Sequence, residues 1–120
     1  MFYLNKINIS NKVVILEKGV FGGCENLNEI TIPYGMINIG DGAFEECKSL
    51  REVSIPDNVA SIGDYAFWNC QSLNQITVWS NVTSIGYSAF DGCKNLTIRA
   101  FKGSYVKRYA LENEIPFEEI

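Results

Sequence analysis

Apolar residues recur along this chain in two short runs that repeat every 23 residues. The first run has the form Leu-x-x-Ile-x-Ile, and its copies are residues 27–32, 50–55 and 73–78. Alternation of β-branched and polar residues predicts a strand that buries one face. A shorter run follows each of these, at residues 36–39, 59–62 and 82–85. Each unit therefore predicts two short strands.

A cysteine marks the same position in every unit, as Cys24, Cys47, Cys70 and Cys93. Phenylalanine stands three residues before each cysteine and leucine three residues after it. An Ile-Gly pair precedes three of the phenylalanines, and its glycine is expected to lead the chain into a single helical turn. One unit cannot bury its own apolar residues, whereas units stacked about 4.8 Å apart bury them as continuous columns. The pattern predicts a repeat solenoid.

The last unit departs from this pattern. Arg99 falls in the column that isoleucine or valine fills in earlier units, which indicates that two residues are missing from this strand. The chain then continues with a segment that predicts a helix.

Ser104 is a suitable N-cap for that helix. Val106, Tyr109 and Ala110 share one helical face, and residues 114–117 predict a final short strand. Because an open solenoid end needs a cap, we interpret this helix and strand as the C-terminal cap.

The predicted fold is a β-rich α/β repeat solenoid in one domain, residues 1–120. Its expected parts are a half-coil at 1–12, repeats at about 13–35, 36–58, 59–81 and 82–103, and the cap at 104–120. Met1 falls in the cysteine column, so the chain begins partway through a coil. Two interpretations stay open: a piece of a longer array, or a short protein whose first half-coil is its own cap.

The motif Ile-Gly-x-x-Ala-Phe-x-x-Cys-x-x-Leu-x-x-Ile-x-Ile-Pro resembles the BspA-like class of leucine-rich repeats. It is carried here by Ile39-Gly40, Ala43-Phe44, Cys47, Leu50, Val53 and Ile55-Pro56, with copies 23 residues to either side. The tail from Gly103 to Phe117 is similar to the C-terminal end of such arrays. The resemblance implies a right-handed leucine-rich-repeat superhelix of about four to five coils. It also implies kinship with bacterial and protozoal surface proteins that act in adhesion and host contact.

Three positions depart from the family pattern. Ser10 and Trp79 stand where proline is expected, and Glu17 stands where glycine is expected. These departures affect local turns.

Charge and composition narrow the function classes. The net charge is −4, without the basic stripe of a nucleic-acid binder or of a protein held on an anionic membrane. Nothing approaches the run of roughly 18 apolar residues that spans a bilayer. The chain has no histidine, the commonest general base and metal ligand. With no catalytic motif in the sequence, we predict a protein that is not an enzyme and holds no cofactor or metal.

Three interpretations of the cysteines remain. Uniform spacing does not resemble the close pairs of a zinc site. Stacked coils could bring cysteines near disulfide range. A column of identical stacked residues is explained most simply as small buried thiols, and this interpretation is favoured.

The candidate partner-binding residues are the outward positions of the first strands and two tryptophans. They are Glu29, Thr31, Glu52, Ser54, Gln75, Thr77, Trp79 and Trp68. Polar sheet faces of this kind serve recognition in repeat proteins, and exposed tryptophan is enriched at binding hot spots. The alternative is that Trp79 covers the adjoining turn or the cap, and that Trp68 packs in the same structural way beside Tyr65.

The predicted function is a non-catalytic module of a surface or adhesin-like protein that recognises a protein (or glycan) partner or host-surface molecule through its sheet. The alternatives are a structural spacer and a cytosolic scaffold. The chain would be at the cell surface or secreted if it is part of an exported protein, and cytoplasmic otherwise. We also predict homodimerisation through the unpaired N-terminal edge at residues 1–4.

Overall fold

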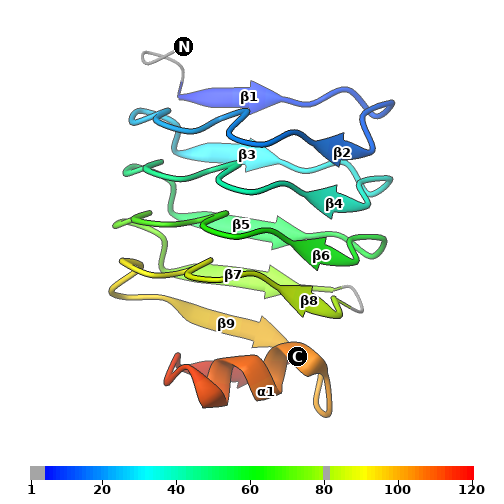
Figure 1. The fold of residues 1–120 in the computed structure, drawn as a ribbon, viewed down its shortest axis with the longest axis vertical. Helices are drawn as coiled ribbons and strands as arrows, with labels where there is room; N and C mark the ends of the chain where they lie inside the picture. The colour runs from blue at the N-terminus through cyan, green and yellow to red at the C-terminus, as the bar shows by residue number, and fades with distance from the viewer. Residues whose placement is uncertain (1–4, 80–81) are drawn as a thin grey trace.

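The chain forms a solenoid of about five turns that ends in a short helix (Figure 1). The structure, a computed structural model, describes residues 5–79 and 82–120. The N-terminal edge predicted for dimerisation, residues 1–4, therefore lies outside the described residues. The predicted leucine-rich-repeat solenoid with a C-terminal cap is confirmed.

Each coil contributes one longer and one shorter strand, as the alternating runs predict. The longer strands are β1 (Lys6–Asn8), β3 (Glu29–Thr31), β5 (Glu52–Ile55), β7 (Gln75–Val78) and β9 (Thr97–Ala100). The shorter strands are β2 (Ile15–Leu16), β4 (Asn38–Ile39), β6 (Ser61–Ile62) and β8 (Ser84–Ile85). All pairs are parallel, because every coil runs in the same direction. We call the outward surface of the longer strands the long-strand face.

The core lies between the two sets of strands and is built from equivalent residues of successive coils. Phe21, Phe44, Phe67 and Phe90 form a stack of rings with centroids 5.5, 5.1 and 5.4 Å apart. Leucines and isoleucines of the strands fill the rest and are buried, among them Leu50 and Ile76. Each such side chain contributes about 1.5–3 kcal/mol by leaving water, so the column as a whole stabilises the stack.

The Ala-Phe-x-x-Cys segment is not the helical turn that the sequence predicts. Its amides alternate between two kinds of partner. Ala43 and Glu45 bond three residues back within the coil, whereas Phe44 and Glu46 donate to carbonyls of the next coil, each at 2.8 Å. Glu46 adopts a left-handed φ of 62°. The prediction was wrong because hydrogen bonds between coils replace those that a helix would make within itself.

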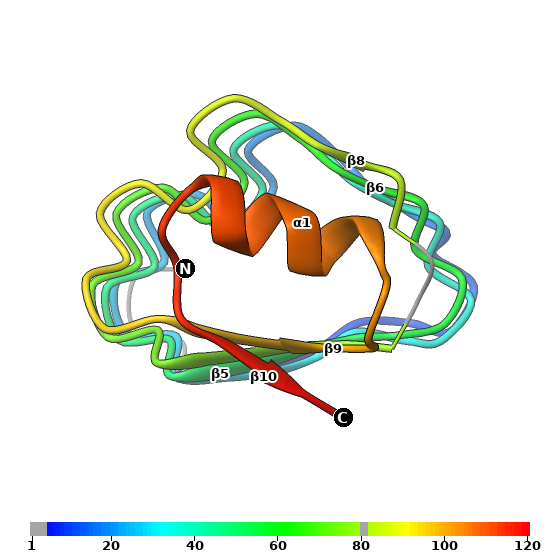
Figure 2. The ribbon, with the colours of Figure 1, turned by 90° about the horizontal axis from the view of Figure 1, so that it is seen from below.

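The C-terminal cap comprises α1 (Tyr105–Glu112) and β10 (Phe117–Glu119). The Ser104 hydroxyl accepts a hydrogen bond from the amide of Lys107, as predicted for an N-cap. Val106 and Ala110 are buried against the last coil, and Tyr109 meets Phe90 edge-on at 6.1 Å. Figure 2 shows α1 lying across the open end of the solenoid. The final strand begins at Phe117, later than the predicted 114–117. Its pairing with β9 starts only at the residue after Pro116.

The register of β9 corrects the prediction for Arg99. Ile98 lies opposite Ile76, and Arg99 lies opposite Thr77, so one residue rather than two is missing relative to β7. Ile98 keeps the core column filled, and it is fully buried. Arg99 therefore points outward, where its Nε lies 3.0 Å from a carboxylate oxygen of Glu118.

Among the described residues, no helix is long and apolar enough to cross a membrane.

Candidate ligand-binding surface

A groove crosses three coils on the long-strand face. It has a volume of about 490 Å³ and is lined by parts of residues 28–31, 51–54 and 74–77. Six predicted site residues line it, namely Glu29, Thr31, Glu52, Ser54, Gln75 and Thr77. They meet because alternate residues of a strand share a face, and equivalent strands of successive coils lie one above another. Strands β5 and β7 pair directly, whereas β3 pairs with β1 in a separate two-stranded sheet. The structure thus gathers most of the predicted site into one surface.

Three lining residues were missed by the sequence analysis. Asn28, Arg51 and Asn74 each immediately precede a longer strand, and they occupy one column of the repeat. The alternating pattern predicts outward positions only inside the strands. All three are polar, which is the signal that a column-by-column comparison of the units would have given. They add two amide groups and one guanidinium group to the lining of the groove.

The charges of the groove are only partly compensated. Lys6 lies 3.9 Å from Glu29, and both side chains are well exposed, so this pair contributes little. Within the described part of the chain, Glu52 and Arg51 form no ion pair. Their donors and acceptors are available to a bound molecule.

Trp79 lies at the C-terminal end of β7, next to this groove. Its indole Nε1–H donates a 3.1 Å hydrogen bond to the hydroxyl of Ser54, which lines the groove. Phe101, the residue that follows β9, meets the indole edge-on with centroids 6.1 Å apart. The side chain nevertheless remains 46% exposed. Trp79 therefore packs against neighbouring residues, as the structural interpretation predicts. It also leaves part of its ring exposed, as the partner-binding interpretation predicts.

Thr77 is not exposed as the sequence analysis predicted. Only 7% of it is accessible, although it lies on the outward side of β7. It lies between Ser54 and Arg99 in the strand register, and Trp79 reaches past it to Ser54. These three neighbours flank it and account for its low exposure, which a strand pattern alone cannot reveal. Its hydroxyl has no hydrogen-bond partner among residues 5–79 and 82–120.

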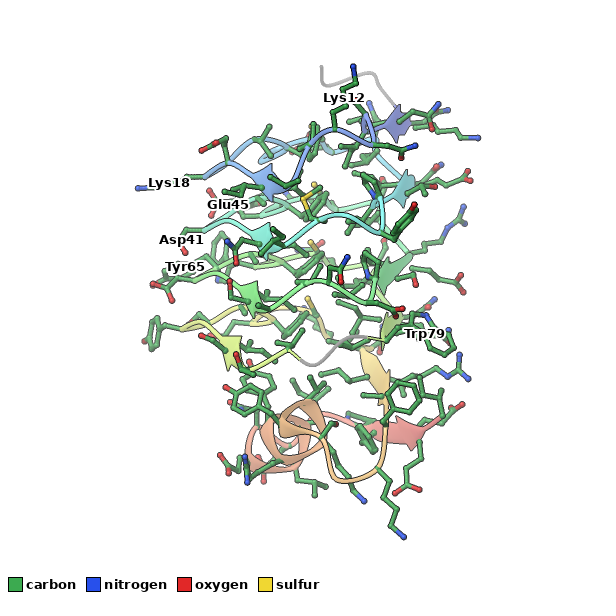
Figure 3. All side chains as sticks on the ribbon, turned by 90° about the vertical axis from the view of Figure 1, so that its right-hand side faces the viewer. Lys12, Lys18, Asp41, Glu45, Tyr65 and Trp79 are labelled. Carbon is green, nitrogen blue, oxygen red and sulfur yellow. The ribbon has the colours of Figure 1, made fainter. Side chains whose placement is uncertain are left out.

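Trp68 does not join the other candidates. It belongs to the turns that follow the shorter strands, where it meets Tyr65 edge-on at 6.4 Å. Tyr65 in turn meets Tyr87, which is 73% exposed. Figure 3 shows Tyr65 and Trp79 on opposite sides of the solenoid. Trp68 therefore lies away from the groove, in a separate aromatic cluster with Tyr65 and Tyr87.

The cysteines are free thiols with structural hydrogen bonds. The Sγ–H groups of Cys47, Cys70 and Cys93 donate to the carbonyls of Phe21, Phe44 and Phe67, at 3.1–3.2 Å. Burial raises the pKa of the Cys47 thiol to about 12. A thiol that stays protonated is a poor nucleophile and a poor metal ligand. Of the described residues, no group of three or more histidine, cysteine, aspartate or glutamate side chains could hold a metal ion.

Known proteins share this architecture. A leucine-rich repeat protein from Bacteroides ovatus is 34% identical over 98% of this chain and 30% of its own, with a TM-score of 0.82. A leucine-rich cell surface protein from Faecalibacterium prausnitzii is 26% identical over 88% of this chain and 34% of its own, with a TM-score of 0.71. The pneumococcal vaccine antigen PcpA has the same fold at 17% identity, over 98% of this chain and 36% of its own, with a TM-score of 0.71.

The chain spans about a third of the length of these solved structures. No curated protein sequence is significantly similar to it. The sequence profile of the BspA-type leucine-rich repeat region matches residues 1–117 in six copies. The chain belongs to the BspA-type leucine-rich repeat family.

Proposed function

We propose that this chain is a non-catalytic binding module of a surface protein, and that it recognises its ligand through the groove on the long-strand face. The observation that carries the proposal is the groove itself. It is open across three coils and lined by polar side chains, several of which have no partner within the described residues. Most of these groups stand on strands that are hydrogen-bonded to a neighbouring strand, so binding costs little ordering entropy.

The relatives support the surface location. The similar protein of Faecalibacterium prausnitzii is a cell surface protein. We infer that this chain is likewise displayed outside the cell.

The chemistry of the chain supports binding rather than catalysis. There is no histidine to act as a general base. The Cys47 thiol remains protonated at neutral pH. The groove carboxylates Glu29 and Glu52 are both exposed to solvent.

The proposal can be tested by blocking one face at a time. Thr31→Cys places an exposed thiol in the groove, and Ser84→Cys places one on β8 of the opposite sheet. Each variant is coupled to a polyethylene glycol maleimide and applied to an array of purified extracellular matrix proteins and oligosaccharides. Untreated and maleimide-treated wild-type protein, whose own cysteines are largely buried, controls for background coupling.

Binding that is lost only on blocking the groove supports the proposal. Binding that is lost only on blocking Ser84→Cys would contradict it and direct attention to the second sheet. If the untreated chain binds nothing on the array, the spacer alternative becomes the better account, with a neighbouring domain supplying recognition.

A further inference from the structure

We propose that the ligand of this groove is an uncharged oligosaccharide. The inference rests on the proposed function and specifies its ligand class. One sugar residue would lie against Trp79 and Thr77, and its neighbours would follow the groove across β5 toward β3. The chain of sugars would run along the axis on which the coils stack. Equivalent side chains recur about every 4.8 Å along that axis, so each coil offers the same kinds of position to the ligand.

The polar lining matches the hydrogen-bonding groups of a sugar. Each sugar hydroxyl both donates and accepts, so its site must offer donors and acceptors together. Arg51 supplies only donors, Glu52 only acceptors, and the Gln75 amide supplies both. These planar side chains present two polar atoms in one plane, which suits adjacent hydroxyls. All three line the groove, and none has a side-chain partner within the described residues.

Thr77 provides an independent observation that points to a ligand. Only 7% of the residue is accessible, it lines the groove, and its hydroxyl lacks a hydrogen-bond partner among the described residues. A buried hydroxyl without a partner costs free energy relative to one that is satisfied. A ligand hydroxyl that reached into the groove would satisfy it and recover that cost.

Trp79 and Phe101 supply the apolar contact that sugars also need. The C–H groups on one side of a sugar ring pack against the electron-rich face of an aromatic ring. The hydrogen bond to Ser54 and the edge contact with Phe101 hold the indole in place, and 46% of the side chain stays accessible. Both aromatics stand immediately after a longer strand, in the column that Pro33 and Pro56 occupy in earlier coils.

Other ligand classes fit this groove less well. Its apolar lining residues, Ile30 and Val53, are themselves buried and leave no pocket for the hydrophobic anchors of a peptide. A peptide cannot add to β7 as a further strand, since β7 is paired on both sides. Glu29 and Glu52 would repel a phosphate or sulfate chain. An uncharged sugar avoids all three difficulties.

The test follows sugar binding through the fluorescence of Trp79. In a Trp68→Phe background, which keeps an aromatic ring against Tyr65, Trp79 is the sole tryptophan. Its fluorescence is titrated with cellohexaose, maltohexaose, mannohexaose and N-acetylchitohexaose, and with a lysine-rich decapeptide for comparison. We expect a saturable shift of the emission with at least one of the four sugars and none with the peptide.

Two variants locate the site. Thr77→Val keeps the shape of the side chain and removes only the hydroxyl. We expect about tenfold weaker sugar binding, with a melting temperature that is unchanged or higher. A hydroxyl with a purely structural role would instead lower the melting temperature. Gln71→Ala, an exposed glutamine outside the groove, serves as the matched control and should leave the affinity unchanged.

Three outcomes would overturn the inference. One is the absence of any saturable change with all four sugars. Another is a sugar response that is equally strong in Thr77→Val and Gln71→Ala, which would place the sugar elsewhere. The third is binding of the decapeptide alone. That result would leave the proposed binding function intact while assigning it a different ligand, so the two failures can be told apart.

Discussion

The indole Nε1–H of Trp79 donates a hydrogen bond to the hydroxyl of Ser54, which lies 25 residues earlier and one coil away. The bond ties the end of β7 to the middle of β5 across the outer surface. It also fixes an aromatic side chain beside the groove through Ser54, which lines the groove. The pair therefore contributes to stability and holds the indole beside the proposed binding groove.

Removing that bond should loosen the indole without unfolding the chain. Ser54→Ala should cost about 0.5–1 kcal/mol, because both partners are partly exposed and water can replace the bond. Iodide quenching of Trp79, measured in the Trp68→Phe background, should rise in the variant. Urea denaturation gives the change in stability. An unchanged quenching constant would mean that Phe101 alone holds the ring in place.

Glycine at position 63 should be indispensable to the stacking. A Cβ added there would lie 2.6 Å from the backbone nitrogen of Asp41 in the preceding coil, closer than real Cβ atoms approach. Backbone cannot move aside as a flexible side chain can. Gly63→Ala should therefore destabilise the chain by about 3 kcal/mol, the upper end of typical overpacking costs.

Gly35→Ala is the matched control for this effect. Its added Cβ would meet only the carbonyl oxygen of Asn11 at 3.9 Å, an ordinary contact. We expect a change within about 0.5 kcal/mol, as for most surface substitutions. Thermal melts of the two variants side by side check the pair. Equal losses of stability would show that the close approach at Gly63 relaxes without cost.

The buried thiols should make the chain less stable in alkali. The pKa of Cys47 is raised by burial to about 12, whereas an unfolded cysteine titrates near about 8.5. The native state thus keeps a proton that the unfolded state releases. The stabilising contribution is complete below the unfolded pKa and is lost as the pH rises toward 12, by up to about 1.4 kcal/mol per pH unit for this thiol.

Two measurements check the behaviour of the thiols. Urea denaturation between pH 7 and 10 should show a falling free energy of unfolding, and Cys47→Ala should flatten that slope. Ellman's reagent at pH 8 should leave Cys47 and Cys70 unmodified until urea is added, because both are fully buried. Rapid modification of either in the native state would contradict the packing described for this column.

The repeat could be predicted from the sequence because each core position recurs in several coils. Phe44 and Phe67 occupy equivalent positions 23 residues apart, and like residues stack on like. The last unit, which is one residue shorter, has no second copy with the same spacing. The displaced Arg99 has no second copy, and only the pairing of Ile98 with Ile76 reveals that a single residue is missing.

The candidate site was predictable in its location but not in its detail. Strand alternation placed Glu52 and Gln75 on one outward face, where the structure has them. The same rule predicted an exposed Thr77, which is buried because Ser54, Arg99 and Trp79 flank it. Contacts of that kind depend on rotamers, and a pattern of polar and apolar residues carries no information about rotamers.

The cap should protect the last coil from opening. The Ser104 hydroxyl accepts a hydrogen bond from Lys107 N–H at 3.1 Å and so begins the helix that covers Phe90 through Tyr109. Ser104→Ala should destabilise this end by about 1 kcal/mol, whereas Ser104→Asp, which keeps a capping oxygen, should not.

Hydrogen exchange distinguishes local from global effects of this change. Solenoids unfold from their ends, because each coil is stabilised chiefly by its neighbours. Amides of β9 and α1 should therefore exchange faster in Ser104→Ala, while those of β5 keep their protection. Faster exchange throughout the stack would show instead that the coils unfold as a single cooperative unit, with the cap stabilising all of them equally.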